Sequence, residues 1–450
     1  MESGAQNALT LINSRELVLL LPLELTVERL GQNPALLWAL DGFDWQDDPQ
    51  GLRSMRACLA EVSKTKRVHD SFAMHAPLEL MARMRIDSAC QSAWSEATRG
   101  VARLQAVATA LAYREQGLLA SQTDAPGHAG HGIQSMQAAI DAGDVQGAQA
   151  AAKQVALSHF PLDVIKALAP DWSLRLPCGA HAALFLSHLA HVVEAVPSLA
   201  AQALQALPLY AGELARAPMH RVPAERLQAN APTRPGSAPE APGALRTALL
   251  ALRPLPGAVS GSIQAIVQQA LDAGMARDLM PLIPQAQALE SSESLWLACM
   301  AAVCEVPLRS MLEDAPAKAK YGWTHALTLP MAAWHLASLG ALERHQALAM
   351  ATLQVAAFRA VIGSGALPAK AMAPALSGGE PVRDETFEGL FAQACTRPDA
   401  HLVKYVLACQ DLGQMAPSLE GLGCLAAKHL TAIWVQEQPD AGLLTSLSLR

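Results

Sequence analysis

The stretch HAALFLSHLAHVVEAV, residues 181–196, shows most plainly how this chain folds. Its apolar residues return every three or four positions, which is the period of an α-helix and not the alternation of a β-strand. The same period recurs in Leu104–Gln116, Gln137–Ala151, Ala244–Leu252, Ile263–Leu271, His335–Ala360 and Leu402–Leu412. Because alternating apolar and polar residues are hard to find, the sequence predicts an all-α fold.

The composition predicts an ordered chain with a large core. Of the 450 residues, 51% are hydrophobic and 16% are charged, which is too apolar for a disordered protein. No segment of about 33 to 47 residues repeats along the chain, so a regular solenoid has little support. We expect a single large, irregular multi-helical domain built of helical hairpins.

The domain is expected to span residues 51–438, with an N-terminal segment, residues 1–50, packed on it. Stretches rich in Pro and Gly predict loops at about 121–132, 217–243 and 363–384. Within residues 138–156, Gly143 and Asp144 mark the turn of a helix–turn–helix.

Charge, hydropathy and cysteine usage exclude several classes of protein. The net charge is −7 with 33 Lys and Arg residues, and the one basic cluster is the short stretch 64–67, so a nucleic-acid partner is not expected. We found no apolar stretch that reaches a membrane span, and no signal peptide. The eight cysteines form no C-x-x-C pair, which indicates a reduced, cytoplasmic protein. The high apolar content weakly favours a homodimer.

The common cofactor and catalytic motifs are absent. The chain has no G-x-G-x-x-G fingerprint for a flavin or nicotinamide, no Walker A sequence and no G-x-S-x-G elbow. It has no H-E-x-x-H, and none of its 14 histidines follows a Glu by three residues, which argues against a ferritin-like di-iron site.

Histidines inside apolar runs are the unusual feature of the sequence. His75, His181, His325 and His401 all lie in such runs, and Lys404 follows His401 by three residues on the same helix face. A lysine among apolar neighbours either extends its ammonium to water or is buried, and a buried ammonium loses its proton readily. The neutral amine can then add CO₂ to form a carbamate, whose oxygens resemble those of a carboxylate.

Four short elements in this order resemble the questin oxidase-like family. The family pattern has Asn-His-x-Pro-Met, a His-Gly-Leu-Ile-type helix, Val-His-Ala-Val-Thr and Asp-Glu-His-x-Ile-Lys. This chain reads MHAPL at 74–78, AHAAL at 180–184, WTHALT at 323–328 and DAHLVK at 399–404. The resemblance spans roughly residues 60 to 430 and rests on order and spacing.

The resemblance implies an all-α non-haem iron oxygenase. Its ligands to Fe(II) would be His75, His181, His325, His401 and Lys404, the lysine as its carboxylated form, arranged around a buried metal site. Such an enzyme is a dioxygenase. It uses O₂ to insert oxygen into an aromatic, quinone-type ring. In ring-opening members it cleaves that ring, with a Baeyer–Villiger-like outcome. The partners implied are a small aromatic substrate and O₂.

Two readings compete with the oxygenase. One is a non-catalytic helical scaffold or interaction protein, which predicts scattered histidines of ordinary exposure. The other is a family member that binds a small ligand without oxygenase activity.

Several other residues have more than one interpretation. Met74, Ala182 and Ala400 depart from the family pattern, which puts the substrate's identity in doubt. His188, His191 and His335 are interpreted as core residues, with a role beside the metal ligands as the alternative. Phe185, Trp323 and Tyr405 fit either stacking on a substrate or the core.

Overall fold

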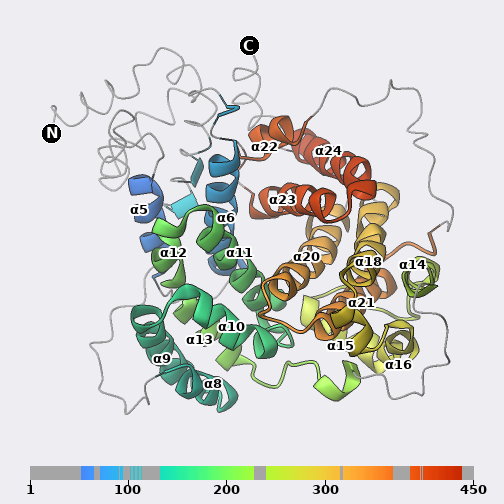
Figure 1. The fold of residues 1–450 in the computed structure, drawn as a ribbon, viewed down its shortest axis with the longest axis horizontal. Coiled ribbons are helices and arrows are strands. Elements are labelled where there is room, and N and C mark those ends of the chain that lie inside the picture. Colours follow the sequence, from blue (N-terminus) through green and yellow to red (C-terminus); the bar gives the residue numbers. More distant parts are fainter. Residues whose placement is uncertain are drawn as a thin grey trace.

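Four helices form a closed ring in the middle of the molecule (Figure 1). They are α6 (Ser71–Ala89), α11 (His181–Ala195), α20 (Thr324–Ser338) and α23 (Ala400–Met415). Helix α6 packs on α11, α11 on α20, α20 on α23, and α23 again on α6. The structure is a computed structural model that describes residues 52–64, 71–90, 92–94, 132–227, 240–314, 318–367, 386–395, 397 and 399–437, with scattered helical positions between 102 and 113.

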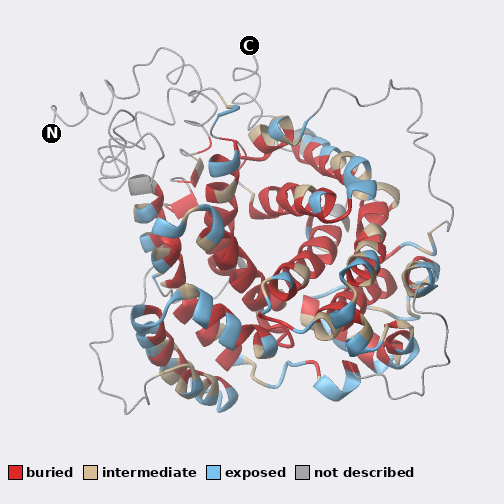
Figure 2. Ribbon diagram, viewed as in Figure 1, coloured by how far each residue is buried: buried red, intermediate tan, exposed pale blue. Residues whose placement is uncertain are grey.

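The ring helices are buried on nearly all sides (Figure 2). In α11, every residue from His181 to Val192 is buried. A helix that is apolar all round belongs in the core of a protein, so these sequences have no polar face to turn outward. No strand occurs in the part of the chain that the structure describes, where only an isolated bridge joins Arg175 and Arg221. The all-α prediction is confirmed.

Other helices surround the ring, and several pair with their chain neighbours as hairpins, among them α8 with α9, α20 with α21, and α23 with α24. Their bounds are α5 Leu52–Val62, α8 Ile133–Asp141, α9 Val145–Ser158, α10 Pro161–Trp172, α12 Pro197–Leu204, α13 Leu207–Arg216, α14 Ala241–Ala251, α15 Ile263–Asp272, α16 Met275–Leu279, α17 Ala286–Ser291, α18 Glu293–Glu313, α21 Arg344–Ile362, α22 Phe387–Cys395 and α24 Glu420–Glu437.

Glycines with positive φ break two of the predicted helices. Gly143 has φ of 73° and ends α8, and the Asp144 side chain then caps α9 by accepting from the Gly147 amide. This is the predicted helix–turn–helix. The prediction of one helix over His335–Ala360 is wrong, because Gly340, with φ of 65°, follows the end of α20. A glycine there closes a helix, while the apolar period continues unbroken on both sides.

The predicted loops fall partly outside the described residues. Of the loop expected over 217–243, a 3₁₀ turn occupies Ala224–Leu227, and α14 already begins at Ala241. Residues 121–131, 228–239 and 368–385 lie outside the described residues, as does the whole N-terminal segment, residues 1–50.

Among the described residues one helix, α18, is long and apolar enough to cross a membrane by length and composition alone, so the expectation that no apolar stretch reaches a membrane span is wrong on that criterion. Its most apolar window of 18 residues is 67% buried by the rest of the structure. Burial of this kind is usual for a core helix of a soluble protein.

Arg83 ties α6 to the chain just before α23. Its guanidinium donates to the Glu79 carboxylate at 2.6 and 2.9 Å, to the carbonyl of Cys395 at 2.5 Å and to that of Arg397 at 2.6 Å. Both Glu79 and Arg83 are buried. Since His75, Glu79 and Arg83 follow each other at four-residue spacing on α6, this pair holds the His75 helix against the one that carries His401.

We expect Arg83→Met to cost about 3–5 kcal/mol of unfolding free energy, because it leaves the buried Glu79 carboxylate without its cation and with the neutral Thr109 hydroxyl as its remaining donor. Denaturant unfolding measures the change. The double variant Glu79→Leu/Arg83→Met should recover much of the loss, whereas Arg56→Met on the exposed face of α5 should change little. A loss below about 1 kcal/mol in the single variant would contradict this role.

Candidate metal centre

The four predicted histidines meet inside the helix ring, one from each helix. The imidazole centroid of His75 lies 4.3 Å from that of His181, 4.4 Å from that of His401 and 6.0 Å from that of His325. The His325 ring lies 5.4 Å from His181 and 4.9 Å from His401. None of the four residues is more than 9% exposed. These residues lie between about 70 and 330 positions apart in the sequence, and the fold alone brings them together.

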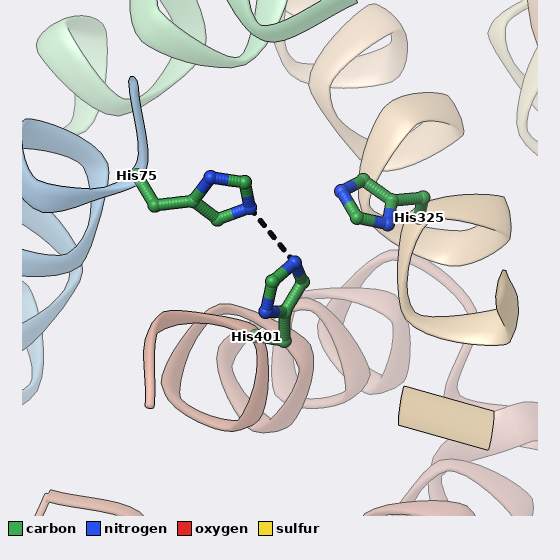
Figure 3. A group of neighbouring side chains, drawn as sticks. All are labelled: His75, His325 and His401. Atoms are coloured by element: carbon green, nitrogen blue, oxygen red, sulfur yellow. Dashed lines mark hydrogen bonds between the residues drawn. The ribbon is translucent and has the colours of Figure 1, made fainter. Parts of the chain in front are cut away.

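Three of these imidazoles present nitrogens to one small volume (Figure 3). One nitrogen from each of His75, His325 and His401 lies within 4.8 Å of the other two. The Nε2 atoms of His75 and His401 are 2.8 Å apart. An octahedral ion with bonds of about 2.1 Å separates neighbouring ligands by about 3 Å. This buried group can therefore hold a metal ion with little movement of these two rings.

His181 reaches the cluster because of the backbone in front of it. Gly179 and Ala180 both have left-handed conformations, with φ of 67° and 57°, and His181 is the first residue of α11. A left-handed conformation is costly for alanine, and among the described non-glycine residues Ala180 alone adopts it. A Cβ on Gly179 would stand 3.2 Å from the His181 ring. This turn fixes the start of α11 and the place of the imidazole.

His325 is oriented by a π-helical turn, Ala319–Trp323, which runs directly into α20. Its Nδ1 lies 2.8 Å from the carbonyl oxygen of Tyr321. A carbonyl can only accept, so Nδ1 carries the proton and Nε2 keeps its lone pair. That Nε2 is buried and has no hydrogen-bond partner among the described residues. This tautomer and outer hydrogen bond are those of a metal-binding histidine.

Asp399 positions His401. Its side chain caps α23 by accepting from the amides of His401 and Leu402 at 2.8 and 2.9 Å. The same carboxylate lies 3.7 Å from His401 Nδ1, on the side of the ring away from His75. At this separation the carboxylate makes no hydrogen bond to Nδ1, and it acts on the ring through its charge, which raises the basicity of the imidazole as a ligand. Asp399 was not among the residues expected to act at the site, although an Asp before a helix is a common cap.

Lys404 lies one turn after His401 and is only 2% exposed. Its Nζ has no hydrogen-bond partner among the described residues. Burial lowers the pKa of its ammonium to about 8, although Asp399 and Glu79 act in the other direction. The residue lines a small cavity of about 20 Å³, together with His188, His191 and Asp411. A cavity of this size holds about one water molecule.

The cluster favours neutral imidazoles. Burial lowers the pKa of His75 well below its usual value, and the neighbouring Lys404, His181, His401 and His325 add to the effect. For His325, burial also comes first, followed by repulsion from His401, His181 and Lys404. Neutral rings keep the lone pairs that a metal needs. A cation held here would replace the missing hydrogen bond of His325 Nε2.

An exposed tyrosine lies beside the cluster, and the sequence analysis missed it. The ring of Tyr321 is perpendicular to that of His401 at 4.9 Å, yet Tyr321 is 60% exposed. The cluster therefore lies just beneath the surface on this side.

The aromatic residues singled out from the sequence, Phe185, Trp323 and Tyr405, are fully buried, and Phe185 stacks on Tyr210 at 4.3 Å. They are core residues.

The departures from the family pattern also lie in the core. Met74, Ala182 and Ala400 are buried among apolar side chains. The Tyr210 hydroxyl donates to the carbonyl of Met74 at 2.9 Å, which anchors α6 next to His75.

Comparisons with family models, curated proteins and solved structures gave no match. The geometry of the site and the sequence therefore carry the functional argument.

Proposed function

We propose that this chain is a non-haem iron oxygenase of the questin oxidase-like type, acting on an electron-rich aromatic or quinone-type ring. The observation that carries the proposal is the convergence of His75, His181, His325 and His401, with Lys404 one turn away. The resemblance stated above supplies the reaction class, since a buried group of imidazoles by itself specifies no chemistry.

Iron, when bound, supplies the reaction with O₂, and the chain supplies its position and surroundings. The Tyr321 carbonyl holds the ring of His325 in a ligating orientation, and the Asp399 carboxylate places a negative charge behind the ring of His401. Burial keeps water away and the imidazoles neutral. Each of these features prepares the site before any ion arrives, which lowers the cost of binding.

Lys404 is the anionic oxygen donor in this proposal. Its neutral amine attacks CO₂, an N–C bond forms, and one proton leaves to give the carbamate anion. With a pKa of about 8, about one amine in ten is neutral at pH 7, against fewer than about one in a thousand for an ordinary lysine. The cavity beside Lys404 leaves space for about one water molecule next to the amine, so neighbouring side chains must move slightly for CO₂ to reach it.

The substrate is expected to approach from the side of Tyr321. The Tyr321 side chain is largely exposed to solvent, and its ring also contacts the ring of His401. An aromatic substrate gains from stacking on such a ring, by about 0.5–1.5 kcal/mol beyond the area it buries. The small cavity near Lys404 has room for about one water molecule and is too small for an aromatic ring.

The scaffold interpretation expects histidines of ordinary exposure, and the four histidines here are buried and grouped. A cytoplasmic location is part of the proposal, supported by the seven cysteines described without a disulfide, six of which are buried.

Oxygen consumption tests the proposed function. Protein loaded anaerobically with Fe(II) is mixed with a panel of hydroquinones under ¹⁸O₂, and O₂ uptake and product mass are followed. We expect at least one substrate to take up ¹⁸O, with uptake at least about 100-fold above that of His325→Ala loaded in the same way. Equal uptake by both proteins across the panel would reject the oxygenase, and iron binding without turnover would favour a ligand-binding role.

A further inference from the structure

A second group of ligating side chains lies outside the four-histidine cluster. His191 and Glu194, near the end of α11, face His335 on α20. The rings of His191 and His335 are stacked, with centroids 3.5 Å apart and planes 5° apart. Glu194 Oε2 lies 3.6 Å from His191 Nδ1 and 3.5 Å from His335 Nε2. One ligand atom from each of the three residues lies within 4.8 Å of the others.

These separations fit a shared ion better than direct hydrogen bonds. Hydrogen bonds between nitrogen and oxygen are about 2.7–3.2 Å long. A tetrahedral ion with bonds of about 2.0–2.1 Å keeps its ligands about 3.4 Å apart. The observed 3.5 and 3.6 Å lie close to that value. Because the two rings are parallel and stacked, at least one imidazole must rotate out of the stack before both lone pairs can meet at one ion.

A buried nitrogen without a partner points to the same place. His335 is only 6% exposed, and its Nε2 has no hydrogen-bond partner among the described residues. Its Nδ1 lies 3.1 Å from the Ser187 hydroxyl, which can accept the Nδ1 proton and leave the Nε2 lone pair toward Glu194.

The protonation states suit a cation. Burial lowers the pKa of His191 to about 4, with Glu194 opposing and His335 adding to the shift. A glutamate carboxyl that is half-exposed is ionised at neutral pH. At neutral pH His191 is therefore neutral and Glu194 ionised, as metal ligands must be.

We propose that His191, Glu194 and His335 form a second cation site, for a divalent ion of the zinc class. Two imidazoles and one carboxylate suit such an ion. Glu194 is half-exposed, with 50% of its side chain accessible, so the fourth position is open to water. The ion would join α11 to α20, the two helices that carry His181 and His325. The site shares no ligand with the deep cluster.

Zn²⁺ binding to the full chain, stripped with a chelator, tests this site. Competition with a chromophoric chelator gives the number of tight sites, and the visible spectrum of Co²⁺ reports tetrahedral coordination. We expect Glu194→Gln to bind one equivalent fewer than the wild type and to lose the tetrahedral Co²⁺ bands. His335→Gln should do the same, whereas His220→Gln, at an exposed histidine, should match the wild type.

The result separates this site from the deep one. His325→Ala should keep the tetrahedral Co²⁺ bands, since it leaves His191, Glu194 and His335 untouched. Because Glu194 is half-exposed, its substitution is expected to leave folding intact, which circular dichroism checks. Unchanged Zn²⁺ stoichiometry and Co²⁺ spectrum in both Glu194→Gln and His335→Gln would overturn the second site, whatever the deep cluster binds.

Discussion

Replacing His325 with alanine is expected to abolish tight iron binding in the deep cluster. His325 Nε2 is buried without a hydrogen-bond partner among the described residues, and its ring is already held by the Tyr321 carbonyl. Loss of an outer-shell partner alone costs about 10–100-fold in metal affinity, and loss of a ligand should cost more. Iron measured by mass spectrometry after anaerobic loading and desalting should fall from about one per chain to near zero.

Control variants set the scale for the loss of iron binding in His325→Ala. Asp399→Asn keeps a good helix cap but removes the charge behind His401, so its iron affinity should fall by about 10–100-fold. His220→Gln changes an exposed histidine outside the proposed ligands and should retain iron. Measuring in a Glu194→Gln background removes the contribution of the second group. Full retention of iron by His325→Ala would reject the deep site.

The fold class could be predicted because apolar residues recur at helical spacing along the chain and few segments alternate apolar and polar residues. In α11 and α20 the apolar residues recur at helical spacing, and no strand pattern competes with them. The ends of the helices were harder to place. The turn at Gly340 lies inside an unbroken apolar period, since both helices of that hairpin are buried. Periodicity reports the burial of a residue and does not report the direction of the chain.

The grouping of His75, His181, His325 and His401 was implied by the resemblance of four short motifs to a family pattern. What orients them could not be predicted, because it depends on backbone atoms. The carbonyl of Tyr321 faces His325 only because a π-helical turn precedes α20. The left-handed Ala180 in front of His181 likewise has no signature in the sequence. Asp399 is the exception, because an Asp before an apolar helix is a readable cap signal.

The group of His191, Glu194 and His335 could not be predicted from the sequence of any single helix. His191 and Glu194 are three residues apart and share a face of α11, which the sequence displays. Their partner His335 comes from α20, and only the packing of α11 on α20 brings it into contact. As isolated histidines in apolar runs, His191 and His335 were interpreted as core residues, and both are indeed buried.

Lys404→Met is expected to stabilise the metal-free protein while it removes the site's anionic ligand. Burial holds the pKa of Lys404 at about 8 instead of 10.5. Below pH 8 the folded state therefore carries a buried ammonium, at a cost of about 3 kcal/mol. Methionine fills a similar volume without charge, so at pH 7 the metal-free variant should be more stable by an amount of that order. Denaturant unfolding with chelator in CO₂-free buffer measures it.

The pH dependence of the unfolding free energy shows whether the buried Lys404 ammonium destabilises the folded state. Because the folded pKa lies below the unfolded one, the unfolded state holds more protons between about pH 8 and 10.5, and wild-type stability should rise with pH in that window. Lys404→Met should lack this contribution, whereas Lys166→Met, at an exposed lysine of α10, should keep the wild-type profile. Parallel profiles for wild type and Lys404→Met would mean that the ammonium is solvated or paired. A rise in the wild type and in Lys166→Met, absent from Lys404→Met, would mean that the chain accepts a costly buried lysine, as expected of a group kept for its chemistry and not for stability.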